Sequence, residues 1–154
     1  MDPNNKYSSK YLDIANTPLF PFGYGLSYTT FKYSEVAVDK NEIKPGEKLQ
    51  VKITVTNSGN YDGEEVVQLY VRDIVASVTR PLKELRGFQK IFLKKGENKE
   101  LTFTLTPEDL NFYDSNLKWI YEPGDFKVFV GTNSSEVKEA SFRLLAGNAV
   151  PDRK

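Results

Sequence analysis

The sequence has 154 residues, enough for one ordinary domain with flanking segments, and its 39% apolar content is sufficient for a hydrophobic core. Its 21 basic and 21 acidic residues cancel, and no apolar run reaches the roughly 18 residues of a membrane-spanning helix, so neither a nucleic-acid surface nor a membrane span is expected. Cysteine and histidine are both absent, which excludes disulfides, thiolate and imidazole nucleophiles and the usual zinc ligands, and we expect no metal and no cofactor.

The first 31 residues are predicted to be irregular. Residues 1–17 are polar and show little periodicity, as a partly mobile terminal segment would. Residues 18–31 (PLFPFGYGLSYTTF) combine prolines, which are incompatible with a helix interior, with many aromatic side chains that need a cover. Either this segment is a strap on the outside of its own domain, or it docks on a neighbouring domain. The side chains that would make such an interdomain contact are Phe20, Phe22, Tyr24, Leu26 and Tyr28.

The clearest strand pattern runs from Leu49 to Asp73. Aliphatic residues alternate with polar ones in residues 49–56 and again in residues 67–72, so each segment has one apolar face. Residues 58–63 (SGNYDG) are typical of a turn. We expect the two strands to lie side by side with their apolar faces on the same side, which a second sheet must then cover.

The rest of the chain adds more short strands. Residues 36–38 precede the central pair, and residues 74–79 form a loop after it. Residues 80–94 alternate poorly; Pro81 suits an edge strand, and Gly87 indicates a bulge. A short helical turn is expected at Thr106-Pro107. Further strands are predicted around Phe103, Trp119, Val128 and Phe142. Seven or eight short strands with almost no helix predict an all-β, two-sheet antiparallel sandwich.

The sequence offers few residues that could act as catalytic groups. Hydrolysis of a glycoside needs two carboxyl groups that face one substrate, but Glu64 and Glu65 are adjacent on a strand and point to opposite faces. We therefore predict no catalytic residue. Exposed aromatic rings could instead stack on sugars, although a core or rim position for Trp119 is the alternative. The stacking candidates are Trp119 and Tyr121, with Tyr61, Tyr70 and Tyr113 as further ones.

Several motifs in order identify a family resemblance. PLFPFGYGLSYTTF resembles the end of the α/β sandwich domain of glycoside hydrolase family 3 enzymes. Downstream, GEEVVQLYVRD, RPLKELRGFQKIFLKKGE, LTPEDLNFYD and EPGDFKVFVGTNSS resemble the immunoglobulin-like, fibronectin type III-like domain that closes many of these enzymes. The resemblance implies that residues 1–31 end a preceding α/β domain and its linker, that residues 32–146 form the fibronectin type III-like sandwich, and that residues 147–154 are a tail.

The resemblance also implies a function. In the family, the catalytic aspartate and glutamate lie on domains that precede this one, so no catalytic residue carries over. The implied role is a non-catalytic C-terminal accessory module of a retaining, periplasmic or secreted β-glucosidase, with the catalytic domains of its own chain as partners. The loop near the active site would contribute Ser77, Thr79 and Arg80. The alternatives are a module that makes weak carbohydrate contacts through exposed aromatics, and an independent adhesion or dimerisation sandwich.

Overall fold

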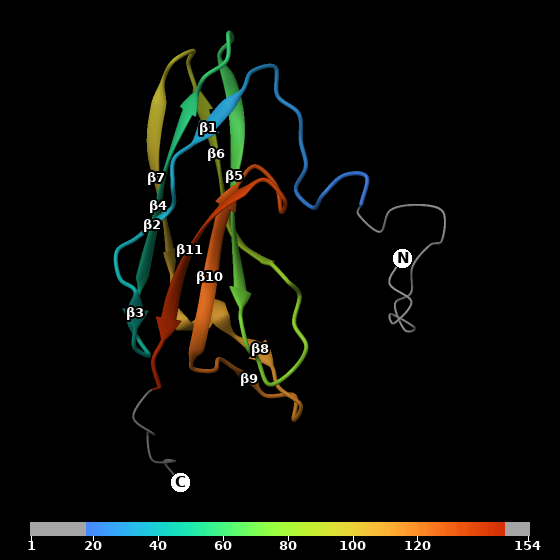
Figure 1. The fold of residues 1–154 in the computed structure, drawn as a ribbon, viewed down its shortest axis with the longest axis vertical. Coiled ribbons are helices and arrows are strands. Elements are labelled where there is room, and N and C mark those ends of the chain that lie inside the picture. The colour runs from blue at the N-terminus through green and yellow to red at the C-terminus, as the bar shows by residue number, and fades with distance from the viewer. Residues whose placement is uncertain (1–17, 147–154) are drawn as a thin grey trace, which may run out of the picture.

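The computed structural model describes residues 18–146, so the expectations for residues 1–17 and 147–154 lie outside the described residues. Two sheets pack face to face in an elongated sandwich (Figure 1). The elements are β1 (Phe31–Tyr33), β2 (Ala37–Val38), β3 (Glu42–Ile43), β4 (Leu49–Asn57), β5 (Gly63–Asp73), β6 (Glu84–Leu93), β7 (Asn98–Leu105), the 3-10 helix η1 (Pro107–Leu110), β8 (Phe112–Tyr113), β9 (Trp119–Ile120), β10 (Gly124–Gly131) and β11 (Val137–Leu144).

The all-β sandwich and the helical turn at Pro107 confirm the prediction, with some differences in strand number and placement. The extra strands are β1, β3 and β8, which have only two or three residues and therefore carry no periodic signal. In the first sheet β4 is central and pairs with β1, β2 and β7; the second sheet has the order β3-β11-β10-β5-β6. No helix within residues 18–146 is long and apolar enough to span a membrane.

The placement of β4 and β5 corrects the prediction that they lie side by side. They belong to different sheets, and the segment between them crosses from one sheet to the other. Their apolar rows face the same core, in which Val51, Val55 and Val67 are completely buried. Both strands show the predicted alternation of apolar and polar residues. This alternation does not distinguish two strands of one sheet from two strands of facing sheets.

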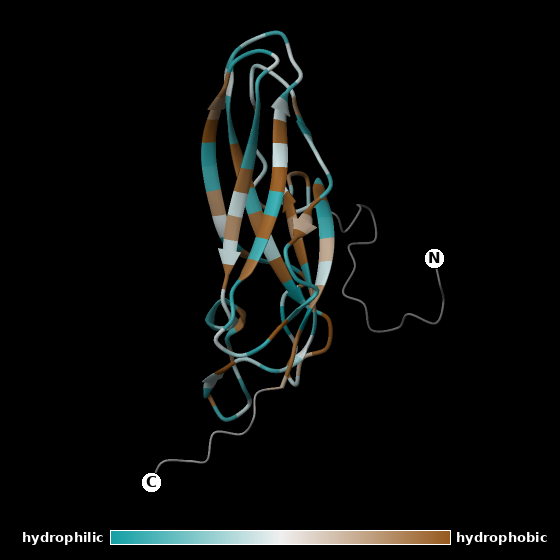
Figure 2. Ribbon diagram, turned by 90° about the vertical axis from the view of Figure 1, so that its left-hand side faces the viewer, coloured by the Kyte–Doolittle hydropathy of each residue, from teal (hydrophilic) through white to brown (hydrophobic). Residues whose placement is uncertain are grey.

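The core consists of the inward rows of both sheets. Figure 2 shows the resulting alternation of hydrophobic and hydrophilic residues along the strands. Each large side chain that is removed from water contributes about 1.5–3 kcal/mol before the cost of chain ordering. The central members are Leu49, Val51, Ile53, Val55, Val67, Leu69, Val71, Leu101, Phe103, Leu105, Phe126, Val128, Val130, Phe142 and Leu144.

The edge strand β6 contains the predicted bulge. Leu69 pairs with Gly87 and Tyr70 pairs with Leu85, so Arg86 is the extra residue. A side chain at position 87 would have its Cβ 3.5 Å from the Phe103 ring, so the strand lies close to the core there. The bulge changes which residues of β6 point outward, and this explains the poor alternation of the sequence.

Asn57 fixes the crossing between the two sheets. It is completely buried, and its side-chain amide donates hydrogen bonds to the carbonyl oxygens of Tyr61 (2.8 Å) and Leu93 (3.0 Å). Its Oδ1 accepts hydrogen bonds from the Thr29 hydroxyl (2.8 Å) and the Gly59 N–H (3.1 Å). One polar side chain thus joins the β4–β5 connection, the end of β6 and the N-terminal segment, with its hydrogen-bonding capacity satisfied.

We expect Asn57→Leu to lower the free energy of unfolding by about 2–4 kcal/mol, because several buried polar groups lose their partners. Denaturant unfolding of the isolated chain measures this. Asn98→Ala, an exposed asparagine at the start of β7, is the matched control and should change stability by less than about 0.5 kcal/mol. Equal effects of the two substitutions would contradict this role of Asn57.

Candidate docking site

The strap, residues 18–30, is held against the five-stranded sheet through its backbone. The Gln68 side chain, on β5, donates hydrogen bonds to the carbonyl oxygens of Gly23 (3.0 Å) and Thr132 (2.6 Å). The Tyr70 hydroxyl donates to Gln68 Oε1 at 2.6 Å and lies 3.4 Å from the Phe22 carbonyl oxygen. Gln68 and Tyr70 lie on the outer face of the sheet. Both are nevertheless buried, because the strap and the segment around Thr132 cover them. Sugar stacking by Tyr70 is therefore excluded, which corrects that candidate.

Gly23 is required where the strap approaches the sheet most closely. Its φ of +80° lies in the left-handed region, which favours glycine. A Cβ at this position would be 2.0 Å from Gln68 Oε1. Conformation and space therefore both demand glycine here.

The backbone of the strap is bound to the sheet, and its apolar side chains are exposed to solvent. The five side chains predicted for docking are between 43% exposed (Tyr24) and 97% exposed (Tyr28). The Phe20 ring packs on Tyr24 with 4.9 Å between ring centroids, and the Phe22 edge meets Tyr70 at 6.4 Å. The two interpretations of this segment are therefore compatible: it lies on its own domain, and its apolar side chains remain free to contact another surface.

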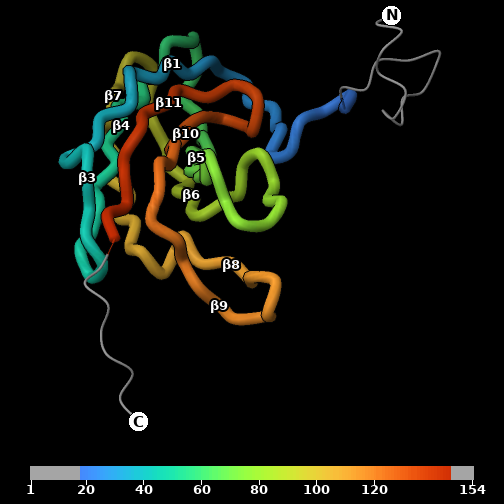
Figure 3. The backbone as a smooth tube through the Cα atoms, turned by 60° about the horizontal axis from the view of Figure 1, so that its bottom comes forward, coloured from blue at the N-terminus to red at the C-terminus, as the bar shows by residue number. Residues whose placement is uncertain are grey.

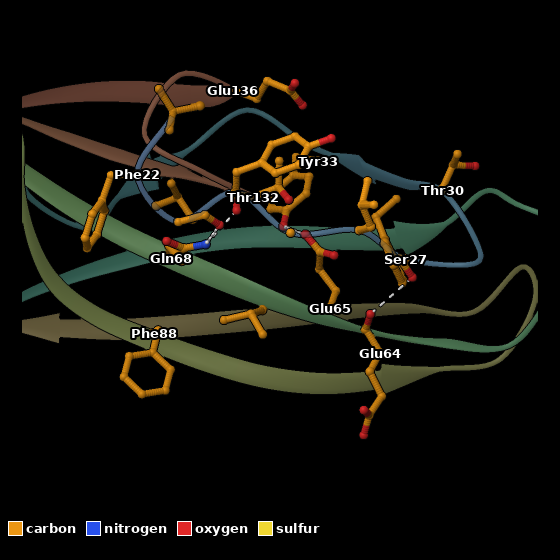
Figure 4. Close-up of a pocket in the computed structure, with 18 of the residues that line it drawn as sticks. Phe22, Ser27, Thr30, Tyr33, Glu64, Glu65, Gln68, Phe88, Thr132 and Glu136 are labelled. Carbon is orange, nitrogen blue, oxygen red and sulfur yellow. Dashed lines mark hydrogen bonds between the residues drawn. The ribbon is translucent and has the colours of Figure 1, made fainter. Parts of the chain in front are cut away.

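A groove of about 930 Å³ lies between the strap and β5 (Figure 4). It exists because β10 stops short: its last partner on β5 is Gln68, so within the described structure residues 63–67 pair only with β6. The strap follows this open side of β5, and the Ser27 hydroxyl approaches the Glu64 carbonyl oxygen at 3.5 Å. The walls include Phe22, Leu26 and Phe88.

Tyr33 and Glu65 lie side by side in the middle of this groove (Figure 4). The Tyr33 hydroxyl donates a 2.6 Å hydrogen bond to Glu65 Oε1, and this bond links β1 in one sheet to β5 in the other. Burial, followed by the hydrogen bond to Glu65 and its negative charge, raises the pKa of Tyr33 far above its ordinary value. The sequence pattern contained one signal for this pair, since Glu65 occupies an inward position in the alternation of β5.

The next part of the outer sheet face is covered by Lys83, a contact that sequence reasoning missed. Its ammonium group lies 4.7 Å from the centroid of the Phe129 ring and donates a 2.6 Å hydrogen bond to the Ser134 carbonyl oxygen. Burial lowers the pKa of Lys83. Phe129 is consequently buried although it points away from the core. No local sequence pattern predicts the contact between Lys83 and Phe129, because the two residues are far apart in the sequence.

At the opposite end of the sandwich, Arg80 is the centre of a buried ion network. Its guanidinium contacts Asp73 at 3.2 Å and Glu84 at 3.1 Å, and Glu84 also pairs with Arg86. The side chains of Arg80 and Asp73 are 9% and 2% exposed. Burial raises the pKa of Asp73, and the positive charge of Arg80 opposes this effect. Ser77 and Thr79 of the same loop are exposed.

Arg80 also holds the segment that follows β7. Its guanidinium lies 4.6 Å from the centroid of the Phe112 ring and 3.4 Å from the Leu110 carbonyl oxygen. The Arg80 side chain is therefore occupied by its own domain. A role of Ser77, Thr79 and Arg80 beside an active site stays a prediction, and within this domain Arg80 acts as a clamp on two connections.

The hairpin of β8 and β9 projects from this end of the molecule (Figure 3). Trp119 is half exposed, and its ring packs against Tyr113 with 4.7 Å between centroids. Tyr121 packs partly against the core, so the two predicted stacking residues do not form one free platform. Sugar stacking by Trp119 and Tyr121 stays a prediction.

We expect Tyr33→Phe to be less stable than the parent chain near neutral pH, by about 1.5–3 kcal/mol, because the buried carboxylate of Glu65 loses its hydrogen-bond donor. The difference should shrink above about pH 10. There the unfolded parent chain releases the Tyr33 proton and the folded chain does not, so the parent loses about 1.4 kcal/mol per pH unit that the variant keeps. Urea unfolding between pH 8 and pH 11 measures both. A constant difference across this range would contradict the burial of Tyr33.

Arg80→Met should lower the free energy of unfolding by about 3 kcal/mol or more, because Asp73 is left as an uncompensated buried charge. Arg143→Met is the control: Arg143 pairs with Asp125 on the exposed surface, and its loss should leave the unfolding midpoint nearly unchanged. Thermal and urea unfolding of the isolated chain provide the comparison. Similar midpoints for the two variants would refute the clamp.

Comparison with known proteins identifies the domain. The family model for the fibronectin type III-like domain matches residues 65–134. A periplasmic β-glucosidase of Salmonella typhimurium is 48% identical over 92% of this chain, and a putative β-xylosidase of Formosa agariphila is 43% identical over 90%. A structure of a β-glucosidase from Listeria innocua in complex with glucose superposes with a TM-score of 0.85 at 42% identity, covering 94% of this chain and 20% of that one.

The chain spans about a fifth of the length of these relatives, since it covers 18% of the Salmonella and Formosa enzymes. The family model places a fibronectin type III-like domain within this stretch, as the sequence motifs predicted. Residues 65–134 therefore belong to the fibronectin type III-like domains, and the chain matches the part of family 3 β-glucosidases that carries this domain.

Proposed function

We propose that this chain is the C-terminal accessory module of a family 3 β-glucosidase and that it packs against the catalytic domains of the same polypeptide. The observation that carries the proposal is the strap: its backbone is bound to Gln68 and Tyr70, while its apolar side chains face outward. Soluble domains rarely expose so large an apolar surface without a partner. In this proposal the strap, residues 18–30, joins the sandwich to the preceding domain.

The outer face of β5 and β6, beside the strap, enlarges the exposed apolar surface of the strap. Phe88 and Phe92 of β6 are 65% and 55% exposed, and Val66 of β5 lies between the strap and β6. Interfaces between domains of one chain bury about 600–1,500 Å² in total, a size that a strap with several aromatic side chains and a neighbouring strand can supply. The proposed role is to stabilise the catalytic domains, with Ser77 and Thr79 on a loop near the substrate entrance.

In this proposal the chemistry belongs to the other domains. A glycosidase needs two carboxyl groups facing one substrate, but Asp73 and Glu84 are paired with Arg80, and Glu64 is paired with Lys90. Within residues 18–146, no three acidic side chains gather as a metal site would require. The hydrolysis of terminal β-linked glucose and a periplasmic or secreted location are proposed for the whole enzyme on the strength of its relatives.

A chimera tests this role. This chain replaces the aligned segment of the Salmonella β-glucosidase, and the melting temperature and the hydrolysis of an aryl β-glucoside are measured. Leu26→Asp combined with Tyr28→Asp should lower the melting temperature of the chimera by several degrees, because charged groups are then forced into an apolar interface. The same pair should leave the isolated chain unchanged, since both side chains are exposed there.

The matched control is Tyr61→Asp, an exposed aromatic residue on the β4–β5 connection, which should affect neither protein. The isolated chain alone should release no aglycone. Equal stability of the chimera with and without the strap substitutions would refute docking through the strap. Turnover by the isolated chain would refute the accessory role itself.

A further inference from the structure

Glu65 is a buried carboxylate without a cation. It is 8% exposed and lies on the inward row of β5 beside Val67. Its Oε1 accepts the hydrogen bond from Tyr33, while no lysine or arginine among residues 18–146 forms an ion pair with it. A buried carboxylate is costly unless it is both hydrogen-bonded and paired with a positive charge. Only the first of these conditions is met within the described chain.

The other charged residues of the groove do not compensate for Glu65. Glu64 is paired with Lys90 at 2.6 Å, and Lys138 is paired with Glu35 at 2.7 Å. Glu136 also lines the groove and forms no ion pair in the part of the chain that the structure describes. Among the described residues, the groove therefore has two carboxylates without an ion-pair partner, and the one lysine in its lining, Lys138, is paired with Glu35.

The walls of the groove restrict which cation fits. On the side of β5 to which Glu65 points, the apolar lining comes from Leu26 of the strap, Phe31 of β1 and Val137 of β11. Val66 and Phe88 also border the groove, but they point to the outer face of the sheet. A bare metal ion or a small amine would leave these apolar side chains in water, whereas a polypeptide segment can fill the groove with an apolar side chain as well. The long apolar stem of lysine or arginine, with its charge at the tip, suits a carboxylate set between apolar walls.

We propose that this groove receives a segment of the catalytic domains that presents a lysine or arginine beside an apolar side chain, and that the cation pairs with Glu65. The inference rests on the proposed function and adds the chemistry of the partner surface. The segment approaches from the open side of β5 at residues 63–67, where β10 has ended. The apolar neighbour of the cation contacts the apolar lining of the groove on the side of Glu65, such as Leu26.

The proposal is tested by the direction in which one substitution changes the melting temperature of the isolated chain and of the chimera. In Glu65→Gln the amide oxygen can still accept the hydrogen bond from Tyr33, so only the charge is removed. The isolated chain should melt at the same or a higher temperature, because an uncompensated buried charge is gone. The chimera with the Salmonella enzyme should melt several degrees lower, because the partner's cation is then left unpaired. Glu100→Gln, on the exposed face of β7, is the matched control and should change neither protein.

The other outcomes overturn the inference. Equal destabilisation of the isolated chain and the chimera would show that Glu65 supports only its own domain, and no effect on the chimera would show that no cation meets it. The strap substitutions make failure of the inference distinguishable from failure of the proposed function. If Leu26→Asp with Tyr28→Asp destabilises the chimera while Glu65→Gln does not, docking stands and the ion pair is refuted; if neither destabilises the chimera, both proposals are refuted.

Discussion

The hydrogen bonds that Gln68 and Tyr70 make to the strap backbone determine which surface this domain presents. A segment with this many aromatic side chains would ordinarily fold them inward, but here the backbone carbonyl of Gly23 is the group that meets the sheet. Once the backbone is bound, most of the side chains can only point outward. The burial of two polar side chains on the outer face of a sheet is thus the condition for an exposed apolar surface above it.

Buried polar groups hold the connections at both ends of the sandwich. Asn57 joins the strap, the β4–β5 connection and β6 at one end, and Arg80 joins Asp73, Glu84 and the segment after β7 at the other. Loops carry backbone groups that need partners, and a side chain with several donors or acceptors can satisfy them together. Such residues fix where the loops lie, so the position of the strap depends on Asn57 as well as on Gln68.

The sequence permitted a correct prediction of the all-β sandwich, its inward rows and the bulge at Gly87, because each rests on local alternation or on backbone chemistry. It did not permit the assignment of β4 and β5 to facing sheets, since alternation does not specify the partner strand. The burial of Tyr70 was missed because the pattern reports only which side a residue faces. What covers that side depends on the strap, more than forty residues away. Glu65 differs, because position 65 continues the inward row of Val67 and Leu69 in the sequence, although the prediction did not use this signal.

Attachment of the strap to its own domain favours the proposed docking. A flexible segment that carried the same aromatic side chains would lose conformational freedom on contact with another domain, at a cost of about 1–2 kcal/mol per residue for the backbone alone. In this molecule the folding of the sandwich has already met that cost through Gly23, Gln68 and Tyr70. Partner contacts would then contribute more fully to the interface, as they do when a binding surface is preorganised. The bonds beneath the strap would therefore strengthen an interface that they do not themselves touch.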